Sequence, residues 1–136
     1  MTRYSYPAIF SPAEEGGYTV NFPDLEGCFT EGDTLTEAIY MAEDVLALIL
    51  YGYETDGRSI PAPSDPGSFD LHEGDFVNYI ACDTMEYRKM YNNKSIKKTL
   101  SIPEWLNEKA TSMNLNFSQI LQEALIEKIN AQWVFL

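Results

Sequence analysis

Apolar and polar residues alternate along the first part of the chain in a pattern that predicts β-strands. Every second side chain from Tyr4 to Phe10 is apolar or aromatic, and the same spacing recurs in residues 18–22; the largely apolar residues 76–82 are expected to form a further strand. Period-two alternation places one set of side chains on the buried face of a sheet. A short strand is also expected at residues 28–30. Pro7 lacks an N–H, which predicts an edge position or a bulge in the first strand.

A helical pattern follows at Thr34. This residue is the expected N-cap, and Glu37 completes a capping box three residues later. Apolar side chains then recur at intervals of three and four, as on the buried face of a helix. They are Leu35, Ala38, Ile39, Ala42, Val45, Leu46 and Ile49. The Tyr51-Gly52 pair predicts the end of the helix. Three strands, a helix and a returning strand predict an α+β fold, with an antiparallel sheet and one packed helix.

The pattern changes between residues 56 and 95. Residues 56–67 contain three prolines and are expected to be irregular. Residues 85–95 are interpreted as a linker after the last strand, although 84–90 contain no Gly or Pro and are compatible with a helix. We therefore expect a first domain over residues 1–84, a linker over 85–95, a small module over 96–130 and an apolar tail over 131–136.

A short basic strand opens the C-terminal module. In residues 97–102 the side chains of Leu100 and Ile102 share one face, while Lys97, Thr99 and Ser101 share the other. The strand has no partner within its own segment, and the simplest partner is the same strand of a second chain. Two such strands form a ribbon of a size that fits the major groove of DNA. The pattern thus favours a DNA-binding homodimer that reads bases with its polar face.

Two short helices are expected after this strand. Pro103 favours the first turn of a helix, and Asn114-Leu115 reads as the turn before the next one. Asn116 is the expected N-cap of that second helix. Its first backbone N–H groups, near Asn116, Phe117 and Ser118, are suited to clamp a DNA phosphate. The alternative is a plain helical hairpin with a basic tail.

The distribution of charged residues also separates the N-terminal part of the chain from the C-terminal part. Residues 1–86 hold 17 acidic and two basic residues, whereas residues 87–136 hold four acidic and seven basic ones, within a net charge of −12. The first part, at −15, would repel nucleic acid and attract a basic partner. An acidic surface that serves only solubility is the alternative.

Other functional classes are disfavoured by what the sequence contains. We find no secretory signal and no apolar run near the length of a membrane span, so a cytoplasmic protein is expected. Cys28 and Cys82 lie in strand-like stretches and are interpreted as buried reduced thiols. With the single His72 they form no metal-binding spacing, and we expect no metal, no cofactor and no catalytic residue.

The C-terminal residues resemble a known DNA-binding family. Lys97-Lys98-Thr99-Leu100-Ser101-Ile102-Pro103, followed by Leu106, Ala110, Ser118 and Leu125, resembles the ribbon-helix-helix domain. By position, the resemblance assigns base reading to Lys97, Thr99 and Ser101.

The N-terminal residues resemble HicB antitoxins, and the two resemblances together cover nearly the whole chain. The motifs that carry this likeness are Tyr6-Pro7-Ala8, Gly17-Tyr18, Phe22-Pro23-Asp24-Leu25, Gly27-Cys28, Thr30 through Leu35, Glu37-Ala38 and Ile60 through Ser64. Many members of that family carry a helix-turn-helix at the C-terminus, and this chain resembles the ribbon-helix-helix branch.

The HicB resemblance implies the antitoxin of a type II toxin–antitoxin pair, with an N-terminal domain similar to a partial RNase H fold. It implies that the domain neutralises HicA, a small basic mRNA-cleaving toxin, and that the C-terminal dimer binds operator DNA. The motifs do not identify the toxin contacts, and the candidates are Asp24, Glu26, Glu31 and Asp33. A stand-alone repressor with a ligand-sensing N-terminal domain is the alternative. An RNase H-like nuclease is disfavoured, because Glu43 and Asp44 are expected on the solvent side of their helix.

Overall fold

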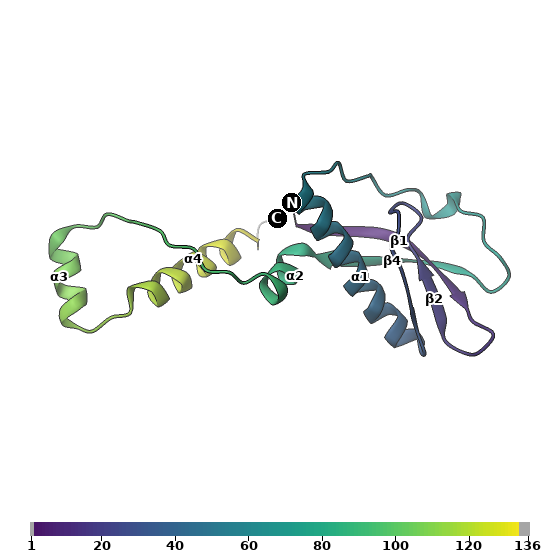
Figure 1. The fold of residues 1–136 in the computed structure, drawn as a ribbon, viewed down its shortest axis with the longest axis horizontal. Helices are drawn as coiled ribbons and strands as arrows, with labels where there is room; N and C mark the ends of the chain where they lie inside the picture. Colours follow the sequence, from purple (N-terminus) through teal and green to yellow (C-terminus); the bar gives the residue numbers. More distant parts are fainter. Residues whose placement is uncertain (1, 134–136) are drawn as a thin grey trace. The chain divides into compact units, whose positions relative to one another are not determined.

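The chain divides into two compact units, one up to Ser95 and one from Ile96 onward. The structure is a computed structural model that describes residues 2–133, and each unit is described by itself (Figure 1). The elements of the first unit are β1 (Arg3–Pro12), β2 (Tyr18–Asn21), β3 (Phe29–Gly32), α1 (Leu35–Asp56), a 3-10 turn (Pro66–Ser68), β4 (Phe76–Asp83) and α2 (Thr84–Tyr91). Those of the second unit are α3 (Glu104–Ser112) and α4 (Phe117–Trp133).

The first unit is a four-stranded antiparallel sheet with α1 against one face. The strand order is β3-β2-β1-β4, so the first strand lies in the interior of the sheet. Alternate residues of β1 face the helix as the spacing predicts: Tyr6, Ala8 and Phe10 are buried. They pack with Ala38, Ala42, Leu46 and Leu50 of α1. The predicted combination of an antiparallel sheet and a packed helix is confirmed.

Pro7 does not mark an edge strand, because β1 is central in the strand order. The pairing explains how the sheet accommodates it. β4 pairs with β1 from Arg3 to Phe10, whereas β2 pairs only from Ile9 onward. Pro7 therefore has a strand neighbour on one side only, and its missing N–H removes no bond on the other side. The predicted edge position is therefore wrong for the strand as a whole, although Pro7 itself lacks a neighbouring strand on one side.

The predicted end of α1 near Gly52 is wrong by about one turn. The helix continues to Asp56 and ends at Gly57, which takes a left-handed conformation (φ 66°) and bonds back to the carbonyls of Tyr53 and Glu54. The last turn is retained because Tyr53 packs against the core and Glu54 accepts a hydrogen bond from Tyr4. At the other end Thr34 is the N-cap, accepting from the Glu37 amide as predicted. Contact with the core begins at Ala38, so Leu35 stays 41% exposed.

Gly32 fixes how closely α1 approaches the sheet. A Cβ at this position would lie 2.4 Å from the backbone nitrogen of Ala38 and 2.6 Å from its Cα. Only a residue without a side chain allows β3 to pass under the first turns of the helix at this distance. Gly17, which precedes the Tyr18 that pairs with Gly32, has φ +80° and is equally confined, since its Cβ would lie 2.4 Å from the Gly32 oxygen.

The second unit contains two helices joined by a tight turn. Asn114 takes a left-handed backbone conformation (φ 55°), which Asn tolerates better than most residues, so the predicted turn at 114–115 is present. Asn116 caps α4 as expected, accepting from the Gln119 amide at 3.0 Å. The helix extends to Trp133, so the expected tail begins within it, and the end of that tail lies outside the described residues. Within residues 2–133 no helix is both long and apolar enough to cross a membrane.

Candidate interaction surfaces

The basic segment at residues 97–102 is unpaired in the single chain. It is assigned no helix or strand, and among residues 2–133 its backbone groups make no hydrogen bond to another element. Leu100 is 54% exposed and Ile102 is 47% exposed. A segment with free backbone groups and exposed apolar side chains is ready to pair with another strand. The three predicted base-reading residues, Lys97, Thr99 and Ser101, are also exposed.

The start of α4 leaves backbone donors free. The Asn116 side chain caps Gln119, and the Asn116 carbonyl accepts from Ile120. Within the described part of the chain, the amides of Phe117 and Ser118 have no partner. Of the three residues predicted to clamp a phosphate, two therefore offer backbone N–H groups, and Asn116 holds the turn that presents them.

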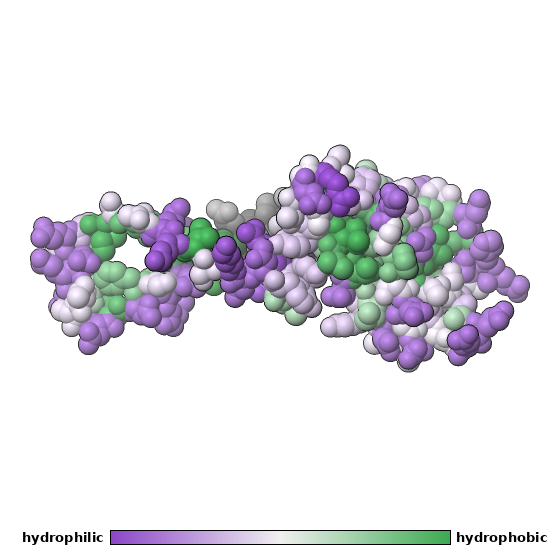
Figure 2. All heavy atoms as spheres, viewed as in Figure 1, coloured by the Kyte–Doolittle hydropathy of each residue, from purple (hydrophilic) through white to green (hydrophobic). Residues whose placement is uncertain are grey.

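The described residues of the second unit form no buried interior of their own. From residue 92 to residue 131 every residue is exposed except Ala110, which is half-buried. The exposed apolar side chains include Leu100, Ile102, Trp105, Leu106, Leu115, Phe117, Ile120, Leu121, Leu125, Ile126 and Ile129. In Figure 2 green residues occur on both helices of this unit. Burying one such side chain contributes about 1.5–3 kcal/mol, so a surface that covered these side chains would stabilise this unit.

Asp24 anchors an irregular segment from a distant part of the chain. Its Oδ2 accepts from the Ser64 amide at 2.9 Å, and its Oδ1 accepts from the Ser64 hydroxyl. Nearby, the Tyr6 hydroxyl donates to the Pro61 carbonyl. The two motifs at residues 22–25 and 60–64 therefore meet in space. Of the four predicted toxin contacts, Asp24 therefore has a structural role. This role could not be predicted from the sequence, because Asp24 and Ser64 are 40 residues apart.

Removing the Asp24 carboxylate should destabilise the first unit. We expect Asp24→Ala to lower the free energy of unfolding by about 2 kcal/mol, because two hydrogen bonds to a charged, half-buried acceptor are lost. Glu26→Ala, an exposed site two residues away, is the matched control and should change it by less than about 0.5 kcal/mol. Urea unfolding followed by circular dichroism measures both. Equal stability of the two variants would contradict an anchoring role.

The other three candidate toxin contacts are exposed and lie on different parts of the surface. Glu26 is in the turn after Asp24, Glu31 is in the edge strand β3, and Asp33 precedes α1. Glu31 borders a groove of about 410 Å³ beside Phe29, whose side chain is 66% exposed. Within the described residues, no three His, Cys, Asp or Glu side chains converge as metal ligands would.

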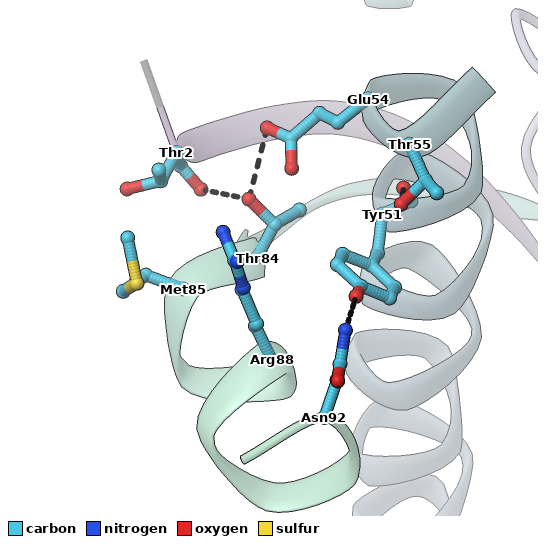
Figure 3. A pocket seen from close by; sticks show the side chains of 8 residues that line it. All are labelled: Thr2, Tyr51, Glu54, Thr55, Thr84, Met85, Arg88 and Asn92. Atoms are coloured by element: carbon cyan, nitrogen blue, oxygen red, sulfur yellow. Dashed lines mark hydrogen bonds between the residues drawn. The ribbon is translucent and has the colours of Figure 1, made fainter. Parts of the chain in front are cut away.

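A polar pocket at the end of α1 was not anticipated from the sequence (Figure 3). It measures about 300 Å³ and is lined by residues of α1 and α2 together with Thr2. The Thr84 hydroxyl lies 3.0 Å from Glu54 Oε2 and 3.2 Å from the Thr2 carbonyl oxygen. Glu54 also accepts from Tyr4 at 2.7 Å. Burial and this bond raise the pKa of Tyr4 to about 12, so its hydroxyl stays protonated and donates.

These contacts hold α2 against α1 and the start of the chain within the first unit. On the other side of the pocket, Asn92 donates to the Tyr51 hydroxyl at 2.8 Å (Figure 3), and the Tyr51 and Tyr87 rings lie 5.4 Å apart. Residues 84–91, most of which fall in the predicted linker, are thus a helix packed on α1. The absence of Gly and Pro from residues 84–90 was the feature of the sequence that was compatible with this helix.

Both cysteines are free thiols. Cys28 is buried, as predicted, whereas Cys82 is only half-buried. Burial raises the pKa of each to about 12, and nearby Asp83 and Glu54 add to the effect at Cys82. Thiols with such pKa values stay protonated and are weak nucleophiles at neutral pH.

Comparison with protein families gives a match over most of the chain. Residues 6–125 match the family described as HicB-like antitoxin of bacterial toxin–antitoxin systems. Antitoxin HicB 1 of Photorhabdus laumondii is 45% identical over 62 residues, which are 46% of this chain and 40% of that protein. Antitoxin HicB of Escherichia coli strain K12 is 42% identical over 65 residues, or 48% and 47% of the two chains. The chain thus spans about half the length of the curated relatives it matches.

Solved structures extend the likeness to both units. A chain of a toxin–antitoxin complex from Streptococcus pneumoniae is 30% identical with a TM-score of 0.60, and the alignment covers 93% of this chain and 99% of that one. The crystal structure of antitoxin HicB3 is 26% identical with a TM-score of 0.50, covering 93% and 98%. Antitoxin HicB of Burkholderia pseudomallei shares the fold, with a TM-score of 0.53, 18% identity and coverage of 92% and 98%.

Proposed function

The chain belongs to the HicB-like antitoxin family, and from this premise we propose that it is the antitoxin of a type II toxin–antitoxin pair. Its first unit binds and neutralises a HicA-type mRNA-cleaving toxin, and its second unit binds operator DNA as a homodimer and represses the operon. It acts by binding, in the cytoplasm, and not as an enzyme. The family match over residues 6–125 is the observation that carries this proposal.

Charge supports a basic partner for the first unit. Residues 1–86 carry 17 acidic side chains against Arg3 and Arg58. A strongly negative surface accelerates encounter with a basic ribonuclease and disfavours contact with RNA or DNA. We therefore assign toxin binding to residues 1–84, with the sheet and α1 as a partial RNase H-like scaffold. The helix α2, at residues 84–91, follows directly and packs on α1.

The unburied apolar residues of the second unit support a dimer. In a ribbon-helix-helix arrangement, residues 97–102 of two chains pair, and Leu100 and Ile102 turn inward onto the helices of both chains. The outward face then presents Lys97, Thr99 and Ser101 to base edges. The free amides of Phe117 and Ser118 bind a phosphate, positioned by the Asn116 cap. This assigns residues 96–130 to dimerisation and DNA binding.

The base-reading face can be tested without disturbing the fold. We expect Thr99→Ala combined with Ser101→Ala to raise the Kd for operator DNA at least about tenfold, because each base contact contributes roughly 1–3 kcal/mol of discrimination. Affinity for unrelated DNA should change little, since phosphate contacts remain. Fluorescence anisotropy at fixed salt measures both.

The matched control changes the same residue types in the first unit. Ser5→Ala with Thr36→Ala, both at exposed sites, should leave operator binding unchanged. Toxin neutralisation should survive in both double variants. If Thr99→Ala with Ser101→Ala also abolishes neutralisation, the division into a toxin-binding and a DNA-binding unit is wrong.

One experiment tests the proposal as a whole. Co-expression with the product of the adjacent gene, followed by native mass measurement, should give a complex that contains a small basic protein and at least two copies of this chain. A dimer that binds operator DNA but captures no neighbouring protein would favour the stand-alone repressor, with the pocket in Figure 3 as the place for a ligand. Mg²⁺-dependent RNA cleavage by the purified chain would favour a nuclease.

A further inference from the structure

A second apolar row runs along α1 on the side that does not face the sheet. Met41 is 37% exposed and Leu48 is 48% exposed, while Val45 between them is half-buried and also packs against the core. Their spacing of four and three residues places them in one row on the helix. Gly52 continues the row, and the space beside it is open, with nothing within 4 Å of where a Cβ would lie. Figure 2 shows apolar residues gathered over the middle of α1.

This row is bordered by negative charge. α1 contains five acidic residues and no basic one. Glu37 and Asp44 lie four residues before Met41 and Leu48, so their carboxylates flank the row on the same side of the helix. Within the described residues neither carboxylate forms an ion pair. The surface thus has an apolar centre and an acidic border. This combination is expected of a binding site for a positively charged protein.

Charge decides between the two simplest occupants. A second copy of this chain would bring another α1 against the first, with five carboxylates on each side and no Lys or Arg on either helix. Like charges facing one another across an interface cost several kcal/mol and act against such pairing. A partner with an apolar ridge flanked by Lys or Arg gains from both the apolar row and its border.

We propose that the strip of α1 formed by Glu37, Met41, Asp44, Val45 and Leu48 is the docking site for the basic toxin. This rests on the proposed antitoxin function and specifies its surface. Leu48 and Met41 fill an apolar recess on the toxin, and Glu37 and Asp44 pair with cations at its rim. The four turn and strand residues Asp24, Glu26, Glu31 and Asp33 are then outside the centre of the contact.

The test uses the full-length chain and the purified small basic protein of the neighbouring gene. Leu48→Lys should raise the Kd at least about a hundredfold, because a charge replaces a central apolar contact and meets like charge on the toxin. Asp44→Lys should raise it about tenfold at low salt and less at high salt, as expected for a rim charge. Calorimetric titration at two salt concentrations measures these values.

A matched control lies on the other face of the sheet. Tyr79 is 51% exposed, and it pairs with Pro7, whose neighbours in β1 face the helix. Tyr79→Lys therefore adds the same charge at a similarly exposed site on the opposite face and should leave the Kd within about threefold. Leu48→Gln serves as a milder variant if Leu48→Lys does not fold. Operator binding should be unchanged in every folded variant.

The outcomes separate the docking site from the function. If the unaltered chain does not bind the basic protein at all, the proposed function fails and the docking site with it. If it binds, but Leu48→Lys and Leu48→Gln bind equally well, or Tyr79→Lys is the variant that loses affinity, the function stands and the docking site is wrong. If Leu48→Lys changes self-association and leaves toxin affinity intact, the strip belongs to a second copy.

Discussion

Leu100→Glu should convert the chain to a monomer and raise its Kd for operator DNA by at least about a hundredfold. Leu100 is 54% exposed in the single chain, and the proposed ribbon buries it between two copies. A glutamate there would place two carboxylates close together in an apolar interior, where each costs several kcal/mol unless paired. Analytical ultracentrifugation measures the mass, and fluorescence anisotropy the operator affinity.

The control for this change is Leu71→Glu. Leu71 belongs to the first unit and is 45% exposed, so the chemical change and the exposure are similar while the site is not part of the ribbon. Both mass and operator affinity should match the unaltered chain. Toxin binding should persist in Leu100→Glu because the first unit has its own core. A Leu100→Glu chain that remains dimeric and binds the operator normally would refute the paired strand.

Gly32→Ala is expected to produce the largest loss of stability in the first unit, roughly 3 kcal/mol. The added Cβ would meet the backbone of Ala38 at 2.4 Å and 2.6 Å, and backbone at the start of a helix cannot move aside as a flexible side chain can. Either α1 shifts away from the sheet or β3 bends, and both expose core residues. Thermal unfolding should show a fall in Tm of more than about 10 °C for a unit of this size.

Gly52→Ala is the matched control for the same chemical change. Gly52 lies within α1, where nothing stands within 4 Å of an added Cβ. Because Ala favours the helix over Gly, this variant should gain about 0.5–1 kcal/mol. A loss of stability at Gly52, or none at Gly32, would show that the close approach of β3 to α1 is not what constrains the glycine.

Local patterns were sufficient to predict most elements of the fold. Alternation from Tyr4 to Phe10 identified the buried face of β1, and Thr34 with Glu37 identified the start of α1. The end of α1 was placed too early because a glycine such as Gly52 often follows the last residue of a helix. Contacts of the last turn with β1 instead continue the helix up to its C-cap, Gly57. Tertiary contacts of this kind override local propensity and leave no mark on nearby sequence.

The candidate sites were predictable to a smaller extent, for the same reason. The bonds of Asp24 with Ser64 and of Glu54 with Thr84 join residues 40 and 30 positions apart, and no periodicity links them. The helical spacing correctly assigned Val45 to the core-facing stripe, but it could not reveal that Met41 and Leu48 are exposed beside it. The N-cap of α4 could be predicted because Asn116 and Gln119 are close in sequence.

The absence of a buried core in residues 96–131 has a consequence for how the second unit depends on protein concentration. The first unit buries its own core, so its folding does not depend on how much protein is present. If the second unit completes its fold by pairing with a second copy, as proposed, the population of the DNA-binding form rises with the square of chain concentration when the chain is scarce. Under the proposed function, each copy would then neutralise toxin at low abundance while the operon is transcribed. Repression would begin only once antitoxin has accumulated, so the dimerisation constant of the second unit would set the concentration at which repression starts.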